Sequence, residues 1–355
     1  RYLGNKTRLL GFIGRVLEER GIRAGAAADP FTGTASVARE LKRRGFHVVA
    51  SDVMEYGYVF ARAYVEVPAT PAFPQLRGVV GPRTPSLAAV LRYLNALPPE
   101  PGFIHEHFTP AGDAGRRHGR MYFTPANAAR IDAIRATLEH WRRADLIDAD
   151  GFHTLLAALI EAADRVANTT GVYASFVKSW QPNALRPLEL VPHRTVHGNG
   201  CRAARSDAVE LLEELPPLDL LYLDPPYNSR QYPGYYHIPE LIALGWFGDE
   251  PPQLRGKTGL LPDRDKRSDW ARRGRCERAL ETLLERARFR HLMLSYNTEG
   301  IIPEATIERL LKAYGRASTY HCYTRAYRRY RSDADGAGRR YLTDRVEERL
   351  YCVDR

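Results

Sequence analysis

The sequence predicts an α/β fold with a doubly wound, mostly parallel sheet that is interrupted by a mainly helical insertion. Short apolar runs end in an acidic residue at 26–29, 46–52 and 220–224, and helical periodicity lies beside each of them. Strands that alternate with amphipathic helices favour a parallel sheet with helices on both faces. The pattern is lost over 68–200, where a proline-rich stretch precedes two long helical patterns. We therefore expect a single α/β domain that contains an insertion.

Each expected element follows from its local pattern. The helix expected over 36–44 stops at Gly45, because glycine readily takes the left-handed conformation that follows a helix. The expected helices span 9–20, 36–44, 125–143, 150–169, 208–215, 238–246, 276–288 and 303–314, and the expected strands span 26–29, 46–52, 204–207, 220–223, 291–297, 318–327 and 346–353. The last two strands suit an antiparallel pair. One predicted domain combines 1–67 with 201–355, and the insertion comprises 68–200.

Composition narrows the class of protein. The 355 residues are 44% hydrophobic, which indicates a globular chain, and the net charge of +10 favours a polyanionic partner such as nucleic acid. The same charge also suits a soluble basic enzyme from an arginine-preferring genome. No apolar stretch is long enough to span a bilayer, and no secretory signal is visible. The four cysteines form no CxxC pair, so we expect neither zinc nor disulfides, and a cytoplasmic location.

Asp224-Pro225-Pro226-Tyr227 is the most informative motif, and it follows the apolar run 220–223 directly. Parallel sheets bind ligands at the carboxyl ends of their strands. The prolines remove two backbone donors, so the carbonyl groups of Asp224 and Pro225 are free to accept hydrogen bonds. A carboxylate and carbonyl acceptors suit an exocyclic amino group, and the ring of Tyr227 offers a face for a planar base. The alternative is a structural turn with a capping aspartate.

Acidic residues also end the other expected strands. Asp29 begins a turn that contains Phe31 and Gly33, where glycine permits close approach of a ligand to a helix N-terminus. The turn is neither a GxGxxG fingerprint nor a P-loop, so an adenosine ligand other than NAD or ATP is favoured. Asp52 stands where doubly wound folds bind ribose hydroxyls, and Asp207 could accept a hydrogen bond from an adenine amino group. Each acid alone could instead be a turn or N-cap residue.

These motifs together resemble the Dam-type adenine-N6 DNA methyltransferases, which use S-adenosylmethionine. The amino-terminal motif of that family is matched by Tyr2, Gly4 and Lys6, and the order of motifs, with the insertion before Asp224-Pro-Pro-Tyr, is also that of the family. Thr34 departs from the family pattern, which often has a second glycine there. The resemblance implies a Rossmann-like methyltransferase sheet and an inserted target-recognition region that binds DNA.

The resemblance also implies roles for single residues. Phe31 would pack on the methionine part of the cofactor, and Lys6 and the backbone near Gly33 would hold its polar end. The remaining cofactor-binding residues would be Tyr2, Asp29, Asp52 and Asp207. The target adenine would be flipped out of the duplex, with Asp224 and the Pro225 carbonyl accepting hydrogen bonds from its amino group and Tyr227 stacking on its ring. The catalytic motif would include Pro226 as well, and no metal would take part.

Two segments are predicted to contact DNA. The first directly follows the catalytic motif and includes Asn228, Arg230, Gln231 and Tyr232, and the second is the arginine cluster Arg328, Arg329 and Arg331. The cluster suits sequence-independent phosphate contacts, although a solvated cationic edge strand is the alternative. In 105–107, His-Glu-His, the strand alternation would put both histidines on one face without a third ligand, so no metal site is predicted.

The predicted function is site-specific methylation of adenine N6 in double-stranded DNA, in restriction-modification or a related DNA-marking role. A cognate restriction endonuclease is a candidate partner, and we expect a monomer in solution. A second hypothesis keeps the cofactor but changes the substrate to RNA, cytosine N4 or a protein amide. A third is a catalytically silent DNA-binding module, against which the intact Lys6, Gly33 and Asp224 argue.

Overall fold

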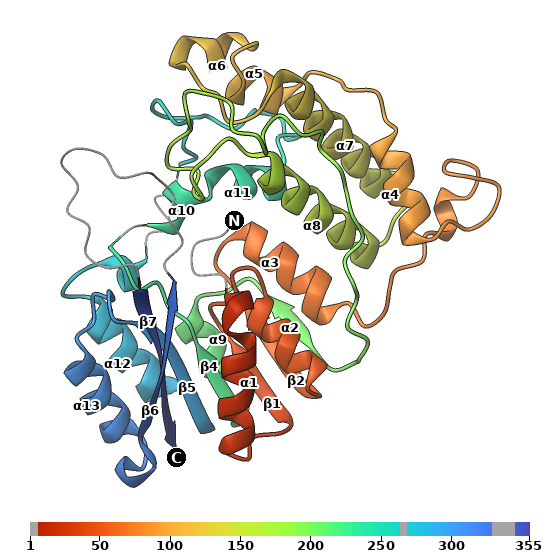
Figure 1. Cartoon of the computed structure of the whole chain (residues 1–355). Helices are drawn as coiled ribbons and strands as arrows, with labels where there is room; N and C mark the ends of the chain where they lie inside the picture. The colour runs from red at the N-terminus through yellow and green to blue at the C-terminus, as the bar shows by residue number, and fades with distance from the viewer. Residues whose placement is uncertain (1–5, 230, 263–267, 329–344) are drawn as a thin grey trace. The chain divides into compact units, whose positions relative to one another are not determined.

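The computed structural model describes residues 6–229, 231–262, 268–328 and 345–355 (Figure 1). Contacts divide the chain into two compact units. The sheet unit comprises Gly4–Val53, Gly198–Gln231 and Lys266–Arg355. The helical unit contains Met54–His197 and Tyr232–Asp265.

The sheet unit is built on seven strands in the order β3-β2-β1-β4-β5-β7-β6. The strands are β1 (Gly25–Asp29), β2 (Phe46–Ser51), β3 (Arg202–Ala204), β4 (Leu218–Leu223), β5 (Phe289–Asn297), β6 (His321–Arg328) and β7 (Arg345–Asp354). The first five pair in parallel, whereas β7 is antiparallel to both β5 and β6. The strand order reverses between β1 and β4, so the topological switch point, where doubly wound folds bind ligands, lies at the carboxyl ends of these two strands.

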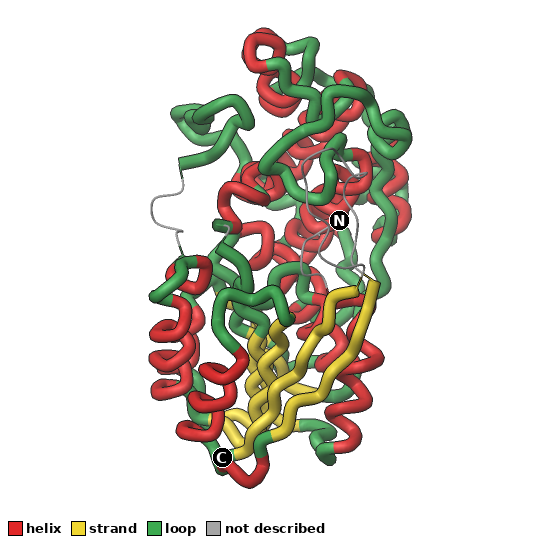
Figure 2. The backbone as a smooth tube through the Cα atoms, turned by 60° about the vertical axis from the view of Figure 1, so that its left-hand side comes forward, coloured by secondary structure: helices red, strands yellow, loops and turns green. Residues whose placement is uncertain are grey.

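Helices cover both faces of the sheet (Figure 2). The helices and helical turns of this unit are η1 (Lys6–Leu9), α1 (Leu10–Glu19), α2 (Ser36–Arg43), α9 (Ala208–Glu214), η5 (Asp269–Ala271), α12 (Cys276–Arg286), α13 (Glu304–Tyr314) and η6 (Ala317–Thr319). One core cluster joins the inward faces of α9, α12 and α13 to Ala28, Leu221 and Leu292 of the central strands. Because both faces are covered, residues 220–223 of β4 form a continuous apolar run and not an alternating pattern.

The helical unit contains two long helices and several short ones. Its elements are α3 (Glu55–Ala61), the π-helical turn η2 (Arg62–Glu66), η3 (Pro74–Leu76), α4 (Leu87–Asn95), α5 (Phe103–Phe108), α6 (Asp113–His118), α7 (Pro125–Arg143), α8 (Ala149–Val166), α10 (Tyr232–Tyr235) and α11 (His237–Leu244). Helices α7 and α8 lie side by side (Figure 1). In the part of the chain described here, no helix combines the length and the apolar character needed to cross a membrane.

Two buried asparagines in the helical unit hold a long irregular segment in place. The amide nitrogen of Asn127 donates to the carbonyl oxygens of Ala184 and Arg186, at 3.0 and 2.9 Å. Asn168 donates in the same way to Met121 and Val177, at 3.0 and 2.9 Å. Each asparagine also accepts a backbone N–H through its side-chain oxygen. Buried backbone groups need partners, so these amides replace the hydrogen bonds that a helix or strand would supply.

The structure confirms the α/β class and the antiparallel terminal strands, and it corrects several local predictions. The third strand, expected over 204–207, is β3 at Arg202–Ala204. Helix α4 lies within the proline-rich stretch, where no helix was expected. Helix α5 contains the His-Glu-His segment, which was expected to alternate as a strand. The His-Glu-His segment lies between Gly102 and Thr109, which are the caps of this short helix. Short helices of this kind carry too few residues for a clear period.

The predicted division of the chain also differs from the compact units. The insertion was expected over 68–200, but the helical unit begins at Met54 and includes Tyr232–Asp265. The reason lies in Glu240 of α11, a buried carboxylate that accepts hydrogen bonds from the backbone N–H groups of Glu55 and Tyr56 at 3.1 Å each. This contact satisfies the free N-terminal donors of α3 and ties it to a segment that lies far away in the sequence.

Truncation of Leu221 should destabilise the sheet unit. Its side chain is fully buried in the core cluster at the centre of β4. Leu221→Ala should lower the free energy of unfolding by about 2–5 kcal/mol, measured by urea denaturation, because it removes apolar contacts and leaves a cavity. Leu185→Ala is the control, since Leu185 is 63% exposed, and it should change stability by no more than about 0.5 kcal/mol. Equal losses in the two variants would contradict this assignment of the core.

Candidate active site at the carboxyl ends of the central strands

A buried lysine and two carboxylates meet at the end of β4. Lys6 Nζ lies 3.2 Å from Asp224 Oδ1 and 2.5 Å from Glu348 Oε1. The side chains of Lys6 and Glu348 are 6% and 2% exposed, whereas that of Asp224 is 17% exposed. Asp224 is therefore the member of this cluster that a substrate can reach. We call Lys6, Asp224 and Glu348 the lysine–carboxylate cluster.

Burial and mutual charge shift the titration of the cluster. Burial raises the pKa of Asp224 to about 7, with Lys6 opposing the shift and Glu348 adding to it. Burial alone would lower the pKa of Lys6, but the charges of Asp224 and Glu348 outweigh it and hold that pKa well above its ordinary value. Lys6 is thus a fixed cation, and Asp224 is a carboxylate whose charge responds to pH near neutrality.

The turn after β1 brings its predicted residues together. Gly33 has φ +51° and donates its backbone N–H to Asp52 Oδ2 at 2.9 Å, so the acid that ends β2 shapes the glycine turn. The left-handed conformation favours glycine at this position. The ring of Phe31 lies edge-on to Trp270, with 5.0 Å between ring centroids. Sequence reasoning missed Trp270, because no local sequence pattern indicates that η5 packs against this turn.

Asp29 is a buried acid at the switch point. Its side-chain Oδ1 is buried and has no hydrogen-bond partner among the residues that the structure describes. Burial, with the nearby charges of Asp224 and Asp52, raises the pKa of Asp29 to about 8. A buried polar atom without a partner is costly, so a ligand that donates a hydrogen bond or carries a positive charge would be stabilised there.

The aromatic end of the predicted catalytic motif is fixed by the loop that follows β5. The backbone N–H of Ile301 donates to the Tyr227 carbonyl at 2.9 Å. The Tyr227 ring stands edge-on to Tyr296, at 6.5 Å between centroids. Tyr296 Oη in turn accepts a hydrogen bond from the backbone of Ile302 at 3.2 Å. The motif is therefore held on two sides, by its own prolines and by this loop.

Other predicted residues have structural contacts of their own. Asp207 caps α9, accepting a hydrogen bond from Val209 N at 2.8 Å, as an N-cap residue does. The side-chain amide of Gln231 both donates to and accepts from the backbone of Ser268, at 3.0 and 2.9 Å. The Tyr232 ring lies tilted against Tyr236, with 5.6 Å between centroids. To take their predicted binding roles, Asp207, Gln231 and Tyr232 would have to share these contacts with the cofactor or the DNA, or give them up.

Several predicted residues lie outside the described residues. Tyr2, Arg230, Arg329 and Arg331 belong to segments that the structure does not describe, and the same holds for the side chain of Arg328. Asn228 is described and is partly buried. The predicted DNA contacts of all these residues stay predictions. Among the described residues, no group of three or more histidine, cysteine, aspartate or glutamate side chains could hold a metal ion.

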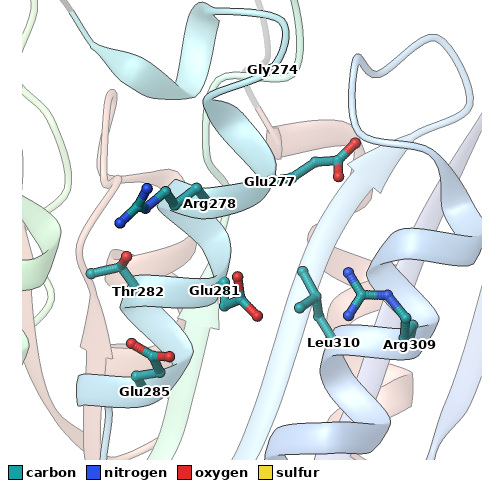
Figure 3. A pocket seen from close by; sticks show the side chains of 8 residues that line it. All are labelled: Gly274, Glu277, Arg278, Glu281, Thr282, Glu285, Arg309 and Leu310. Atoms are coloured by element: carbon teal, nitrogen blue, oxygen red, sulfur yellow. The ribbon is translucent and has the colours of Figure 1, made fainter.

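A groove of about 450 Å³ lies between α12 and α13, away from these residues (Figure 3). Its lining consists of Gly274, Glu277, Arg278, Glu281, Thr282, Glu285, Arg309 and Leu310. Three of these side chains are glutamates spaced four apart along α12, which places them on one face of the helix. The groove contains none of the predicted site residues, and we interpret it as a solvated polar face.

Glu348 and Ser295 belong to the candidate site through their contacts, and sequence reasoning missed both. Ser295 Oγ donates to Glu348 Oε1 at 2.6 Å, so the carboxylate accepts hydrogen bonds from both Ser295 and Lys6. One signal was present in the sequence. Glu348 stands two and four residues before the buried Leu350 and Cys352, on the strand face that they share, where an acid is unusual.

Comparison with known proteins gives a consistent family. Residues 2–308 match the model of the D12 class N6 adenine-specific DNA methyltransferases. The chain is 36% identical to the type II methyltransferase M.FokI of Planomicrobium okeanokoites, over 94% of this chain and 50% of that protein. It is 33% identical to the type II methyltransferase M.NlaIII of Neisseria lactamica, over 100% and 99% of the two chains. It is 32% identical to the modification methylase StsI of Streptococcus sanguinis, over 94% and 49%.

The sheet with its antiparallel β7, and the acid-ended strands around the switch point, define a Rossmann-like methyltransferase. The chain belongs to the D12 class of N6 adenine-specific DNA methyltransferases. It spans about half the length of M.FokI and StsI, and nearly the whole length of M.NlaIII.

Removal of Lys6 should destabilise the sheet unit in a pH-dependent way. Lys6→Met leaves two buried carboxyl groups without their cation, and the pKa of Asp224 rises further because Lys6 holds it down. An acid whose pKa is raised on folding loses its contribution to stability as the pH rises. The loss relative to wild type should therefore be larger at pH 8, at about 3–5 kcal/mol by urea denaturation, than at pH 5.

The matched control for Lys6→Met is Arg8→Met, which removes an exposed cation from the same short helix. It should alter the free energy of unfolding by no more than about 0.5 kcal/mol at either pH. A loss in Lys6→Met that is the same at pH 5 and pH 8 would mean that the carboxylates do not depend on this lysine.

Proposed function

We propose that this protein transfers a methyl group from S-adenosylmethionine to N6 of an adenine that is flipped out of double-stranded DNA at a specific site. The observation that supports this most strongly is the position of Asp224-Pro225-Pro226-Tyr227. It ends β4 beside the switch point, and its acid is paired with the buried Lys6. Family membership supports the same chemistry, and the relatives are named as type II methyltransferases and modification methylases.

The residues around the end of β1 fit the cofactor. S-adenosylmethionine carries a cationic amino-acid part, a ribose and an adenine, and when bound it supplies an electrophilic methyl group. The buried Oδ1 of Asp29, which has no hydrogen-bond partner among the described residues, suits the cationic part. Asp52 shapes the glycine turn through Gly33 and would bind the ribose hydroxyls, as acids at this position of doubly wound folds do. Phe31 would pack on the methionine part, and Asp207 would bind the adenine.

Asp224 would act on the target base as a hydrogen-bond acceptor. A carboxylate has about four lone-pair sites, so its contact with Lys6 leaves capacity to accept from the adenine amino group. The Pro225 carbonyl would accept the second amino hydrogen, and Tyr227 would stack on the ring. These contacts hold the nitrogen lone pair toward the methyl group, and such positioning can supply several kcal/mol of barrier reduction. The extrusion of the base from its stack makes its amino group reachable.

DNA binding would use both units. The net charge of +10 favours a polyanion. We propose that Asn228, Arg230, Gln231 and Tyr232 contact the DNA near the target base, that the arginines at 328, 329 and 331 contact phosphates, and that sequence choice resides in the helical unit. The relatives named as type II methyltransferases support a role in restriction-modification. We also propose that the protein is a cytoplasmic monomer and that a cognate endonuclease is its partner.

Loss of the Asp52 carboxylate should weaken cofactor binding. Asp52→Ala removes the predicted ribose acceptor and the support of Gly33 N, so the affinity for S-adenosylmethionine should fall by about 1–3 kcal/mol in isothermal titration calorimetry. Glu213→Ala, which removes a half-exposed acid of the same unit, should bind the cofactor as wild type does. An unchanged affinity in a folded Asp52→Ala protein would remove Asp52 from the ribose role.

Loss of the Asp224 side chain should stop methylation but not cofactor binding. Asp224→Ala leaves the pair between Lys6 and Glu348 intact, so the protein should fold. Transfer of radiolabelled methyl to duplex DNA should fall by about 100-fold or more, because an acceptor at the reacting amino group is lost. Tyr227→Ala should reduce the fluorescence rise of duplexes that carry 2-aminopurine at the target position.

The same assay separates the competing functions. Wild-type protein should label duplex DNA at adenine N6, and not RNA, cytosine N4 or protein. Labelling of RNA or protein alone would replace the proposed substrate. DNA binding without any methyl transfer would indicate a silent binding module, and near-normal methylation by Asp224→Ala would contradict the proposed mechanism.

A further inference from the structure

Glu348 is a buried carboxylate that the mechanism above does not use. It lies on β7, opposite Asn297 of β5, and its side chain is 2% exposed. Because β7 runs antiparallel to β5, a residue near the start of β7 lies at the edge where β5 ends. This is the edge that also carries the end of β4. The strand direction thus brings a residue from near the C-terminus to the catalytic motif.

The contacts of Glu348 lead to the catalytic acid through one intermediate. Its Oε1 accepts hydrogen bonds from Ser295 Oγ at 2.6 Å and from Lys6 Nζ at 2.5 Å, and Lys6 Nζ lies 3.2 Å from Asp224. The closer of the two carboxylates around the lysine is therefore the one that a substrate cannot reach. The more distant one, Asp224, is also the more exposed, at 17% against 2%.

Charge explains why a second carboxylate would be useful. If Lys6 were paired with Asp224 alone, the full ammonium charge would draw electron density from the acid that must accept hydrogen bonds from adenine. A buried ion pair also needs its remaining donors satisfied, or it is costly. Glu348 shares the ammonium and satisfies part of its donor capacity, while Ser295 satisfies part of the acceptor capacity of Glu348.

We propose that Glu348, supported by Ser295, is a positioning residue for methyl transfer: it holds Lys6 between two carboxylates, so that Asp224 stays oriented toward the substrate and remains a strong acceptor. This inference rests on the proposed adenine methylation. Glu348 does not touch the substrate in this scheme and acts only through Lys6. No sequence motif singled it out.

The pH dependence of methylation gives a readout that a purely structural role would not move. Lys6 and Glu348 are the ionisable groups that shift the pKa of Asp224, and Asp224 in turn raises the pKa of the neighbouring Tyr222 and Asp29. Burial raises the pKa of Asp224 to about 7, and Glu348 adds to the rise. Protonation of Asp224 makes it a weaker acceptor, so the rate should fall as the pH drops below about 7. Loss of the Glu348 charge should move this fall to lower pH.

The experiment uses the full chain, duplex DNA that contains the target site in its unmethylated form, and saturating radiolabelled S-adenosylmethionine. Single turnovers are measured from pH 5.5 to 9. In Glu348→Gln the side chain can still accept from Lys6, but its charge is gone. The plateau rate, measured where the rate no longer changes with pH, should fall by about 10- to 100-fold, because small changes around reacting groups are costly. The acid limb, which is the part of the pH profile where the rate falls as the pH drops, should shift to lower pH. Glu348→Asp keeps the charge but loses reach, so the limb should stay in place while the rate falls.

The control is Glu347→Gln, the same change at the neighbouring position of β7, where the side chain is 39% exposed and paired with Arg349. It should keep the wild-type rate and acid limb. Thermal melting of each variant identifies any that fails to fold. If Glu348→Gln does not fold, Glu348→Asp carries the test, because a folded Glu348→Asp protein with the wild-type plateau rate would overturn the inference.

The inference is overturned if a folded Glu348→Gln protein methylates DNA with the rate and acid limb of wild type. It is also overturned if Glu348→Gln and Glu347→Gln lose rate equally with no shift of the limb, because Glu348 would then act only on stability. Failure of the proposed function is distinguishable, since the wild-type protein itself would not methylate DNA. A limb that shifts in Glu348→Gln also assigns it to Asp224, because the charge of Glu348 acts on that acid.

Discussion

One buried ammonium group between two carboxylates is the constraint around which the edge of the sheet is organised. Removing three charges from water is expensive, and the arrangement is stable only because each charge has a partner within hydrogen-bond distance. The three residues come from the amino-terminal helix η1, from the end of β4 and from β7, and Lys6 and Glu348 are 342 positions apart. The cluster can therefore form only when the sheet unit is folded, which links the chemistry proposed for Asp224 to the folding of η1 and β7.

The order of the strands decides which groups surround that cluster. The reversal between β1 and β4 brings Asp29 and Asp224 to the ends of neighbouring strands. There burial and the charge of Asp224 raise the pKa of Asp29, whereas burial and the charge of Glu348 raise the pKa of Asp224. The antiparallel insertion of β7 between β5 and β6 adds Glu348 to the same edge. Such a concentration of buried acids is destabilising, and strain of this kind is typical of sites that bind a cationic or amino-bearing ligand.

The helical unit is stabilised by side chains that hydrogen-bond to its irregular backbone. Much of it is irregular backbone, whose polar groups must be satisfied without a ladder of hydrogen bonds. Asn127 and Asn168 do this for the segment after α8, and Glu240 does it for the start of α3. Loops that are held in this way can vary in exposed side chains while their backbone keeps its shape, which suits a unit that we propose to select the DNA sequence.

The sequence by itself determined the α/β class, the terminal antiparallel strands and the motifs at 29–33 and 224–227, because strand periodicity, prolines and glycines are local signals. The sequence also placed Asp52 at the end of the next strand, but its hydrogen bond with Gly33 N was decided by the tertiary structure. Only the tertiary structure decided that Lys6 contacts Asp224, that Trp270 packs on Phe31 and that the helical unit includes 54–67 and 232–265. It also decided the place of Glu348, since no local pattern encodes which strand lies beside β5; contacts between distant segments depend on packing of the complete sheet.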